Sequence, residues 1–265
     1  MSCRQLTQRG ISAGERGDWA KSEQMLAQAI QSCPVDAESR RQYAEVLWRR
    51  GARAEALAQV EAAIRLSSDD PSLLVRAAEM KLELGSVDAA FEGAEQALDL
   101  DPKSCRAWAA RGHVMLKAGQ LRQALADYHR ALSCEPNNRE VLLAIAEIYR
   151  QTNQPQRAVV TLHCLIDTYP IGDEPQHPLY LAGLAYAALS RYDDAARSLQ
   201  LAAARGPANP EILFRLAEVE LQAGRPQFAR AAVDRALVVE PQHAASQALL
   251  ERMAANEAGR GTLNR

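Results

Sequence analysis

Hydrophobic and small residues recur along residues 105–138 with the spacing of helix faces. One set follows an i, i+3, i+4, i+7 pattern, and a second set begins after a short polar stretch. The two sets are Trp108, Arg111, Gly112 and Met115, followed by Ala124, Tyr128, Ala131 and Leu132. Gly119 lies between the sets, and Pro136 follows the second. The pattern predicts two helices joined by a glycine turn, with proline ending the second helix.

This pattern recurs along the chain with a step of 34 residues. Four sets of equivalent positions, which we call columns, have the same residue type in several repeats. Three have members 34 residues apart and the fourth has members at multiples of 34: Gly17, Gly51, Gly85, Gly119; Ala29, Ala63, Ala97, Ala131; Ala56, Ala90, Ala124, Ala158; and Pro34, Pro102, Pro136, Pro170. The frame then slips by three residues, because Pro207 lies 37 residues beyond Pro170, and the step of 34 resumes at Pro241. We therefore divide the chain into seven two-helix repeats at 3–36, 37–70, 71–104, 105–138, 139–172, 176–209 and 210–243, with an insert at 173–175.

The small residues in these columns predict close helix crossings. Where the two helices of a repeat approach each other, only Gly or Ala leaves room for the backbones. In the fourth repeat, Gly112, Ala124 and Ala131 would be the contact points, with Trp108 and Tyr128 filling the space beside them.

The repeat resembles the tetratricopeptide repeat, whose pattern has an early Trp, a Leu-Gly pair, a Tyr, a turn Gly, two Ala and a closing Pro. The matching residues are Trp108, Arg111-Gly112, Met115, Gly119, Ala124, Ala131 and Pro136, and again Leu179, Ala182-Gly183, Tyr186, Ala195, Ala202 and Pro207. The resemblance covers residues 3–243 and implies an all-α fold, a right-handed α-solenoid of seven helix-turn-helix repeats. We expect a capping helix at 244–257, since an open stack needs its last apolar face covered, and a flexible tail at 258–265.

The fifth repeat departs from the pattern. Leu165 replaces the second Ala, Asn153 replaces the turn Gly, and the insert 173–175 follows. Asn tolerates the left-handed conformation, but a large side chain at a tight crossing typically costs about 1–3 kcal/mol unless the neighbours move apart. Two interpretations are open: Leu165 and the insert mark a local opening of the solenoid, or the insert is a tolerated addition to an exposed loop.

Charge and hydropathy argue against two classes of partner. The 31 basic and 33 acidic residues give a net charge of −2, and no dense Lys/Arg block marks a nucleic-acid binder. No apolar run approaches the roughly 18 residues that a bilayer-spanning helix needs. We expect no nucleic-acid partner and no direct membrane insertion.

The five cysteines are Cys3, Cys33, Cys105, Cys134 and Cys164, an odd number without a CxxC pair. This spacing argues against zinc and thioredoxin-like sites. We expect free structural thiols and a cytoplasmic location. The alternative is a lipid-anchored or periplasmic protein, in which Cys3 is the lipidated residue of a lipoprotein whose signal was lost through a misplaced start codon.

The sequence indicates no enzyme, cofactor or metal site. Among the histidines, only His163 has an adjacent nucleophile, Cys164, and neighbours on a helix point about 100° apart, which disfavours a nucleophile–base pair. The glycines occupy repeat columns and do not have the spacing of phosphate-binding loops.

The resemblance implies that the first helix of each repeat lines an inner, concave surface and the second helix forms the outside. Helical spacing then indicates which side chains point inward. The predicted partner-binding residues are Arg41, Glu45, Trp48, Arg49, Glu79, Arg106, His113, Lys117, Glu147, Arg150, Tyr180, Leu184, Phe214, Glu218 and Leu221. We expect a column of acids flanked by arginines in the N-terminal and central part, and a more apolar surface near the C-terminus.

Trp48 is the predicted anchor of a partner, because Trp beside Arg is typical of interface hot spots. The alternative is that Trp48 packs against the adjoining repeat. Trp19 and Trp108 occupy packing columns and are interpreted as core residues.

The leading functional hypothesis is a scaffold that binds an extended or helical segment of another protein in this groove. Two alternatives stay open: self-association into a homo-oligomer, and a lipid-anchored envelope assembly factor. A family subclass that clamps the C-terminal carboxylate of chaperone tails uses Lys and Asn at inward positions. Here those positions hold Arg41 and Glu45, then Val75 and Glu79, and the acids disfavour a carboxylate.

Overall fold

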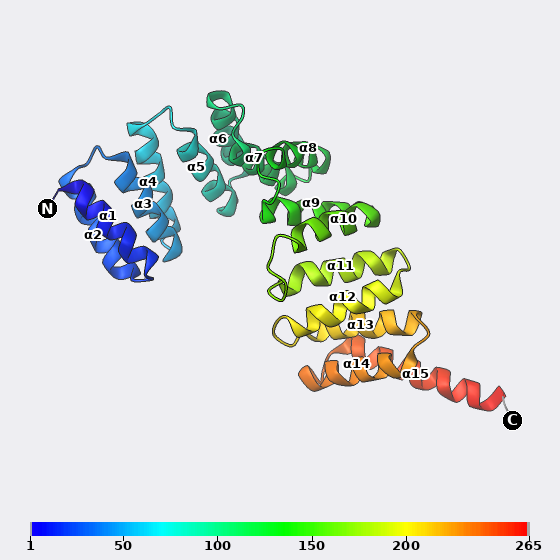
Figure 1. Ribbon diagram of the computed structural model, residues 1–265. Helices are drawn as coiled ribbons and strands as arrows, with labels where there is room; N and C mark the ends of the chain where they lie inside the picture. Colours follow the sequence, from blue (N-terminus) through cyan, green and yellow to red (C-terminus); the bar gives the residue numbers. More distant parts are fainter. Residues whose placement is uncertain (1, 264–265) are drawn as a thin grey trace. The chain divides into compact units, whose positions relative to one another are not determined.

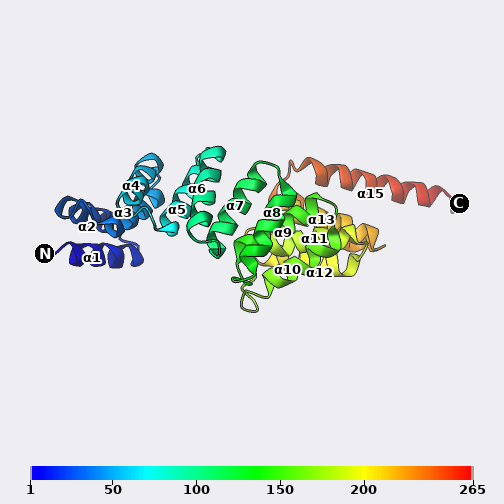
Figure 2. The same cartoon turned by 90° about the horizontal axis from the view of Figure 1, so that it is seen from above.

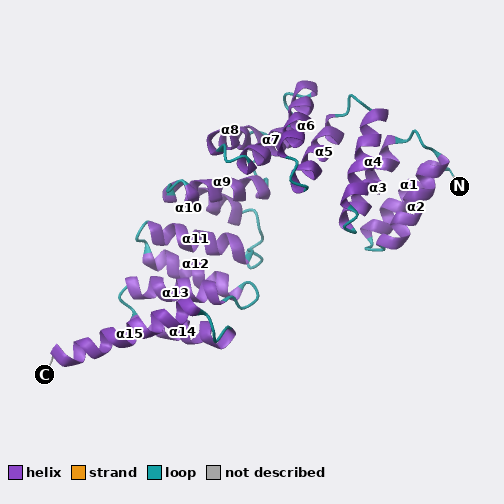
Figure 3. Ribbon diagram, turned by 180° about the vertical axis from the view of Figure 1, so that it is seen from behind, coloured by secondary structure: helices purple, strands orange, loops and turns teal. Residues whose placement is uncertain are grey.

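The computed structural model describes residues 2–263, with side chains from Ser2 to Ala255, and within this range the regular structure is helical (Figures 1 and 3). The helices are α1 (Cys3–Glu15), α2 (Trp19–Ser32), α3 (Ala37–Arg49), α4 (Arg53–Leu66), α5 (Pro71–Glu83), α6 (Val87–Leu100), α7 (Cys105–Lys117), α8 (Leu121–Leu132), α9 (Arg139–Gln151), α10 (Pro155–Ile166), α11 (Gln176–Ala188), α12 (Tyr192–Ala204), α13 (Pro210–Gln222), α14 (Pro226–Val239) and α15 (Ala244–Leu263). Each predicted repeat holds two of them, which confirms the all-α repeat fold.

The helices group into two compact units, an N-terminal unit of residues 1–136 and a C-terminal unit of residues 137–265. The N-terminal unit contains the first four repeats and the C-terminal unit the remaining three. Within each unit, the two helices of a repeat pack against each other, as Figures 1 and 2 show, and the second helix packs against the first helix of the next repeat.

The repeat columns have the structural roles that their residue types predict. Gly119, in the turn between α7 and α8, has a φ of +74°, a left-handed conformation that glycine adopts without a steric penalty. Asn153 takes the same role in the fifth repeat with a φ of +53°. Gly112 lies where α7 crosses α8, and a Cβ there would come within 2.6 Å of Tyr128 Cε1. Ala124 and Ala131 are buried in the same crossing, which confirms their interpretation as spacers.

The fifth and sixth repeats pack directly, which contradicts the first of the two open interpretations, a local opening at the insert. Leu165 is buried, and α10 packs against α11. The connecting loop is also held in place: Glu174 accepts hydrogen bonds from the Gly172 amide at 3.0 Å and from Arg205 Nε at 3.1 Å. The boundary between compact units lies at 136/137, not at the insert. The alternative interpretation, a tolerated loop insertion, agrees with this arrangement.

Helix α15 follows the last repeat, and its first half covers the end of the C-terminal unit. Leu249 and Met253 are buried, and α15 packs against α13 and α14, as expected of a capping helix. The helix continues to Leu263, beyond the predicted end at residue 257 and into the segment predicted as a flexible tail. Residues 264–265 of that predicted tail lie outside the described residues.

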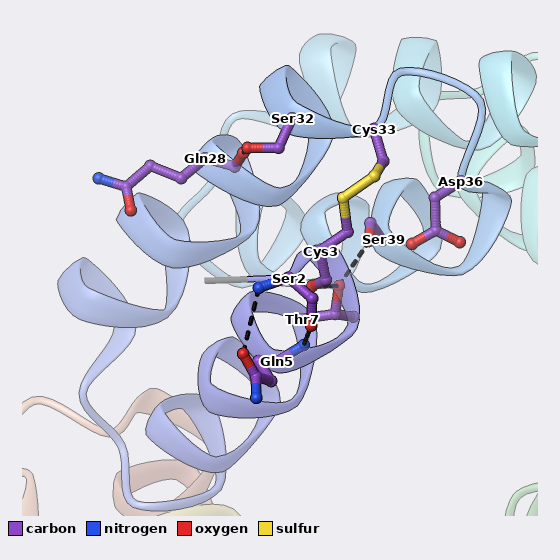
Figure 4. The surroundings of a disulfide bond; sticks show 9 residues. All are labelled: Ser2, Cys3, Gln5, Thr7, Gln28, Ser32, Cys33, Asp36 and Ser39. Atoms are coloured by element: carbon purple, nitrogen blue, oxygen red, sulfur yellow. Dashed lines mark hydrogen bonds between the residues drawn. A yellow bond between two sulfur atoms is a disulfide. The ribbon is translucent and has the colours of Figure 1, made fainter.

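Two disulfide bonds each join the two helices of one repeat. Cys3, at the start of α1, is bonded to Cys33 after α2, with Cα atoms 6.1 Å apart (Figure 4). Cys105, at the start of α7, is bonded to Cys134 after α8, with Cα atoms 6.3 Å apart. Cys164 is free and exposed. The expectation of free thiols is therefore wrong for four of the five cysteines.

This error has a physical reason. Short-range spacing reveals only cysteines that are close along the chain, whereas an antiparallel helix pair brings together residues 29 or 30 positions apart. The Cys3 sulfur, being part of a disulfide, is also not available for a thioether bond to lipid. The lipoprotein interpretation of Cys3 does not fit this pairing.

Candidate partner-binding surface

The first helices of the N-terminal unit carry eight of the predicted partner-binding residues. They are Arg41, Glu45, Trp48 and Arg49 on α3, Glu79 on α5, and Arg106, His113 and Lys117 on α7. All eight are exposed or partly exposed. Val75 on α5, which helical spacing also places on the inward side, is in contrast fully buried.

Three of these residues belong to an alternating series of charges across α3, α5 and α7. The Arg76 guanidinium donates to both carboxylate oxygens of Glu45, at 2.6 and 2.8 Å, and to Glu79 at 3.2 Å. Arg106 donates to the Glu79 carboxylate at 3.0 and 2.8 Å. We call Glu45, Arg76, Glu79 and Arg106 the charge ladder. It links the first helices of three consecutive repeats.

Arg76 is the member of the ladder that the sequence analysis missed. Burial acts to lower the pKa of its guanidinium, but the hydrogen bonds and charges of Glu45 and Glu79 outweigh burial and raise the pKa above its ordinary value. Arg76 therefore stays charged. The expected column of acids is present in this unit, but its carboxylates are neutralised by arginines of the neighbouring helices.

A cleft of about 440 Å³ opens beside the ladder, between α1, α2 and α3. Glu45 and Arg49 line it, as do Glu15 from α1 and the Trp19 ring from α2. The Arg49 guanidinium lies over the Trp19 ring, 4.9 Å from its centroid, a cation–π contact. Trp19, interpreted as core from its repeat column, is thus partly buried and forms a wall of the cleft.

Trp48 is partly buried where the second and third repeats meet. Its ring packs against a buried cluster that includes Leu47, Val60 and Met80, from α3, α4 and α5. The guanidinium of Arg76 lies 5.5 Å from the ring centroid. These contacts favour the alternative interpretation, in which Trp48 packs against the adjoining repeat.

Trp108 and His113 also have internal partners. The Trp108 ring is partly buried, its Nε1 donates to the Pro102 carbonyl at 2.9 Å, and Arg111 and Arg130 lie 4.5 and 4.3 Å from its centroid. The His113 Nδ1 and the Tyr128 hydroxyl form a hydrogen bond of 2.8 Å. The partly exposed His113 ring is therefore oriented by α8.

The C-terminal unit carries the other seven predicted residues on α9, α11 and α13. Glu147 and Arg150 lie on α9, Tyr180 and Leu184 on α11, and Phe214, Glu218 and Leu221 on α13. Six of them keep exposed area, and Glu147 contacts His177 Nε2 at 3.3 Å.

Phe214 is the exception, and the prediction that it is an accessible partner-binding residue is wrong. Its side chain is 8% exposed, and the ring of His243 stacks edge-on against it with 5.9 Å between centroids. His243 follows α14, 29 positions along the chain, so spacing on α13 alone did not reveal this cover.

Within the described residues, no group of three or more His, Cys, Asp and Glu side chains is placed to hold a metal ion. Over the same part of the chain, no helix combines the length and apolar character that crossing a membrane requires.

Comparisons with known proteins agree with this architecture. Models of the tetratricopeptide repeat family match residues 7–71, 94–126, 115–170 and 186–253. The Hsp70-Hsp90 organizing protein of Triticum aestivum is 24% identical over 141 residues, which are 53% of this chain and 24% of that protein. The chain thus spans about a quarter of the length of this relative.

Solved structures show the same fold. YrrB, whose structure is described as a TPR protein with an unusual peptide-binding site, superposes with a TM-score of 0.65 at 16% identity, over 72% of this chain and 97% of YrrB. One chain of the APC/C hetero-tetramer Cut9-Hcn1 superposes with a TM-score of 0.70 at 15% identity, over 92% of this chain and 48% of that chain. The repeat columns, the helix pairs and the family models lead to one conclusion: this chain belongs to the tetratricopeptide repeat family.

Proposed function

We propose that the chain is a non-catalytic scaffold that binds an extended or helical segment of another protein on the first-helix surface of its N-terminal unit. Membership of the repeat family supports a role in protein–protein interaction. The names of its relatives support it too, since the wheat relative is called an organizing protein of Hsp70 and Hsp90, and YrrB is described as having a peptide-binding site. Both descriptions concern those proteins, and the partner of this chain is not implied by them.

The observation that carries the proposal is the cleft beside the charge ladder. A volume of about 440 Å³ accommodates one or two side chains, and Trp19, Arg49 and Glu15 offer it an aromatic face and two exposed charges of opposite sign. Aromatic residues and arginine are the usual energetic centres of protein interfaces. A segment anchored here would continue along α3, α5 and α7, past Glu79 and Arg106.

The charge ladder supports binding by fixing this surface before a partner arrives. Arg76 and Arg106 are each held by paired hydrogen bonds to carboxylates, so their side chains have little rotamer freedom left to lose. Binding to ordered side chains avoids part of the entropy cost of association.

Arg49 provides the direct test, because it is exposed and its removal leaves the core intact. The full chain is immobilised, peptides are selected on it from a displayed library of random sequences, and their affinities for variants are measured in solution. Arg49→Ala should weaken binding by about tenfold or more, the loss typical of an interface hot spot. Arg65→Ala is the matched control, since Arg65 is also exposed but lies on the second helix α4.

Two results would contradict the proposal. One is the absence of any peptide that binds the chain above background. The other is equal affinity of the selected peptides for the wild type and for Arg49→Ala, which would place their binding surface elsewhere.

A further inference from the structure

The two disulfide bonds occupy matching places in two different repeats. Cys3 and Cys105 are each the first residue of a repeat and lie 102 residues apart, which is three repeat lengths. Their partners, Cys33 and Cys134, each follow the second helix of their own repeat, at positions that differ by one residue in the repeat frame. The other five repeats have no cysteine at their first residue or directly after their second helix. The cysteines at these two places therefore occur as pairs or not at all, as expected of residues that work as bonded pairs.

The two bonded repeats are the first and the last of the N-terminal unit. Within that unit, each end repeat packs against a neighbouring repeat on one side only. The stability of a repeat stack comes from the repeats themselves and from the interfaces between neighbours. A covalent bond between the two helices of one repeat adds to the first of these contributions, because it restricts the unfolded chain.

Each bond also holds a helix that contributes to the candidate surface. The Cys3 bond fixes the start of α1, where the Thr7 hydroxyl hydrogen-bonds to Ser39 of α3 at 2.6 Å (Figure 4). Further along, α1 supplies Glu15 to the cleft. The other bond fixes the start of α7, directly before Arg106, the last member of the charge ladder.

We propose that the N-terminal unit matures in an oxidising compartment, where both disulfides form. Each bond then holds together the two helices of one repeat, the first or the last of this unit. Each bond forms by thiol–disulfide exchange: a Cys thiolate attacks an external disulfide, which gives a mixed disulfide and releases one external thiol. The thiolate of the second Cys then attacks the sulfur of the first Cys in the mixed disulfide and releases the other external thiol. The pair of thiols loses two protons and two electrons, and the external disulfide is reduced to two thiols. Such bonds persist outside reducing cytosol, so this location replaces the cytoplasmic one expected from free thiols. The proposal does not depend on what the surface binds.

The first test counts free thiols in the protein as cells make it. The full chain is isolated from its own cells under acid quench, alkylated with iodoacetamide without reductant, and measured by intact mass. We expect one label, on Cys164, and five labels after reduction. Peptide mapping should recover Cys3 linked to Cys33 and Cys105 linked to Cys134. Five labels before reduction, or links between other cysteines, would overturn the proposal.

The second test measures how the two bonds affect local unfolding of the repeats that contain them. Amide hydrogen exchange is compared between the oxidised and the reduced full chain, with Cys164→Ser as a control whose exchange should match the wild type in both states. Reduction should accelerate exchange by roughly tenfold or more in residues 3–36 and 105–136, because closure of these loops no longer restricts local opening, while 37–104 stays unchanged. The same exchange in both states, or an increase spread evenly over residues 3–136, would refute the role of the bonds in the end repeats.

Discussion

Arg76 on α5 donates two hydrogen bonds to the carboxylate of Glu45 on α3, at 2.6 and 2.8 Å, and so joins two consecutive repeats. The Arg76 side chain is 15% exposed, whereas that of Arg106, which makes the equivalent contact from α7 to α5, is 54% exposed. The two pairs have similar geometry but different solvent screening. Their contributions to stability should therefore differ.

Arg76→Met should lower the free energy of unfolding by about 1–3 kcal/mol. The change leaves the Glu45 carboxylate without the two hydrogen bonds from its mostly buried partner, and a charged group that loses such a partner is costly, whereas Glu79 keeps its hydrogen bonds from Arg106. Urea unfolding measures the loss. Arg106→Met is the matched control and should cost less than about 1 kcal/mol, because an exposed ion pair contributes little. Equal losses in the two variants would contradict the importance of the Arg76 contacts.

Gly112→Ala should destabilise the fourth repeat by about 1–3 kcal/mol, since the added Cβ would lie 2.6 Å from Tyr128 Cε1. Tyr128 is fully buried, and its hydroxyl is bonded to His113, so the ring has little room to move. Gly93→Ala is the comparison. There the nearest atom is Ala78 Cβ at 3.3 Å, and the higher helix propensity of Ala, about 1 kcal/mol, offsets a small displacement. Thermal unfolding of both variants tests the prediction, and a smaller loss for Gly112→Ala than for Gly93→Ala would contradict it.

A free C-terminal carboxylate should not increase the affinity of a peptide for this chain. The arginines Arg76 and Arg106 already bind Glu45 and Glu79, so an incoming carboxylate would compete with these acids and be repelled by them. Each peptide selected on the chain is synthesised in acid and amide forms, and fluorescence anisotropy compares them. Tighter binding of the acid form by about tenfold would show that the chain clamps carboxylate tails after all.

The fold followed from the sequence because its determinants are local and repeated. Gly119, Ala124 and Ala131 each indicate one turn or one helix crossing inside a single repeat. The same residue types recur every 34 residues, so the pattern can be recognised from many repeats at once. The boundary at 136/137 has no such signal. It depends on packing between whole helices, whereas the insert at 173–175, visible in the sequence, leaves α10 packed against α11.

The candidate surface was predicted only in part, because periodicity shows which face a side chain occupies but not what else covers that face. Helical spacing placed Glu45 and Glu79 correctly, yet it did not indicate that Arg76 binds both of them. The prediction for Phe214 was wrong for the same reason, since the ring that covers it, His243, lies in the segment between α14 and α15. The disulfides became evident only when the helix pairing brought cysteines from opposite ends of a repeat together.

Site-specific photocrosslinking tests the partner-binding surface most directly. A photoreactive amino acid replaces Gln42, which lines the cleft from α3, or Gln96, which is exposed on the second helix α6. Each full-length variant is made and irradiated in the cells where the protein occurs, and crosslinked products are identified by mass. We predict a specific crosslinked protein from position 42 and none from position 96. Crosslinking of the same protein from position 96 alone, or equally from both positions, would contradict binding on the first-helix surface.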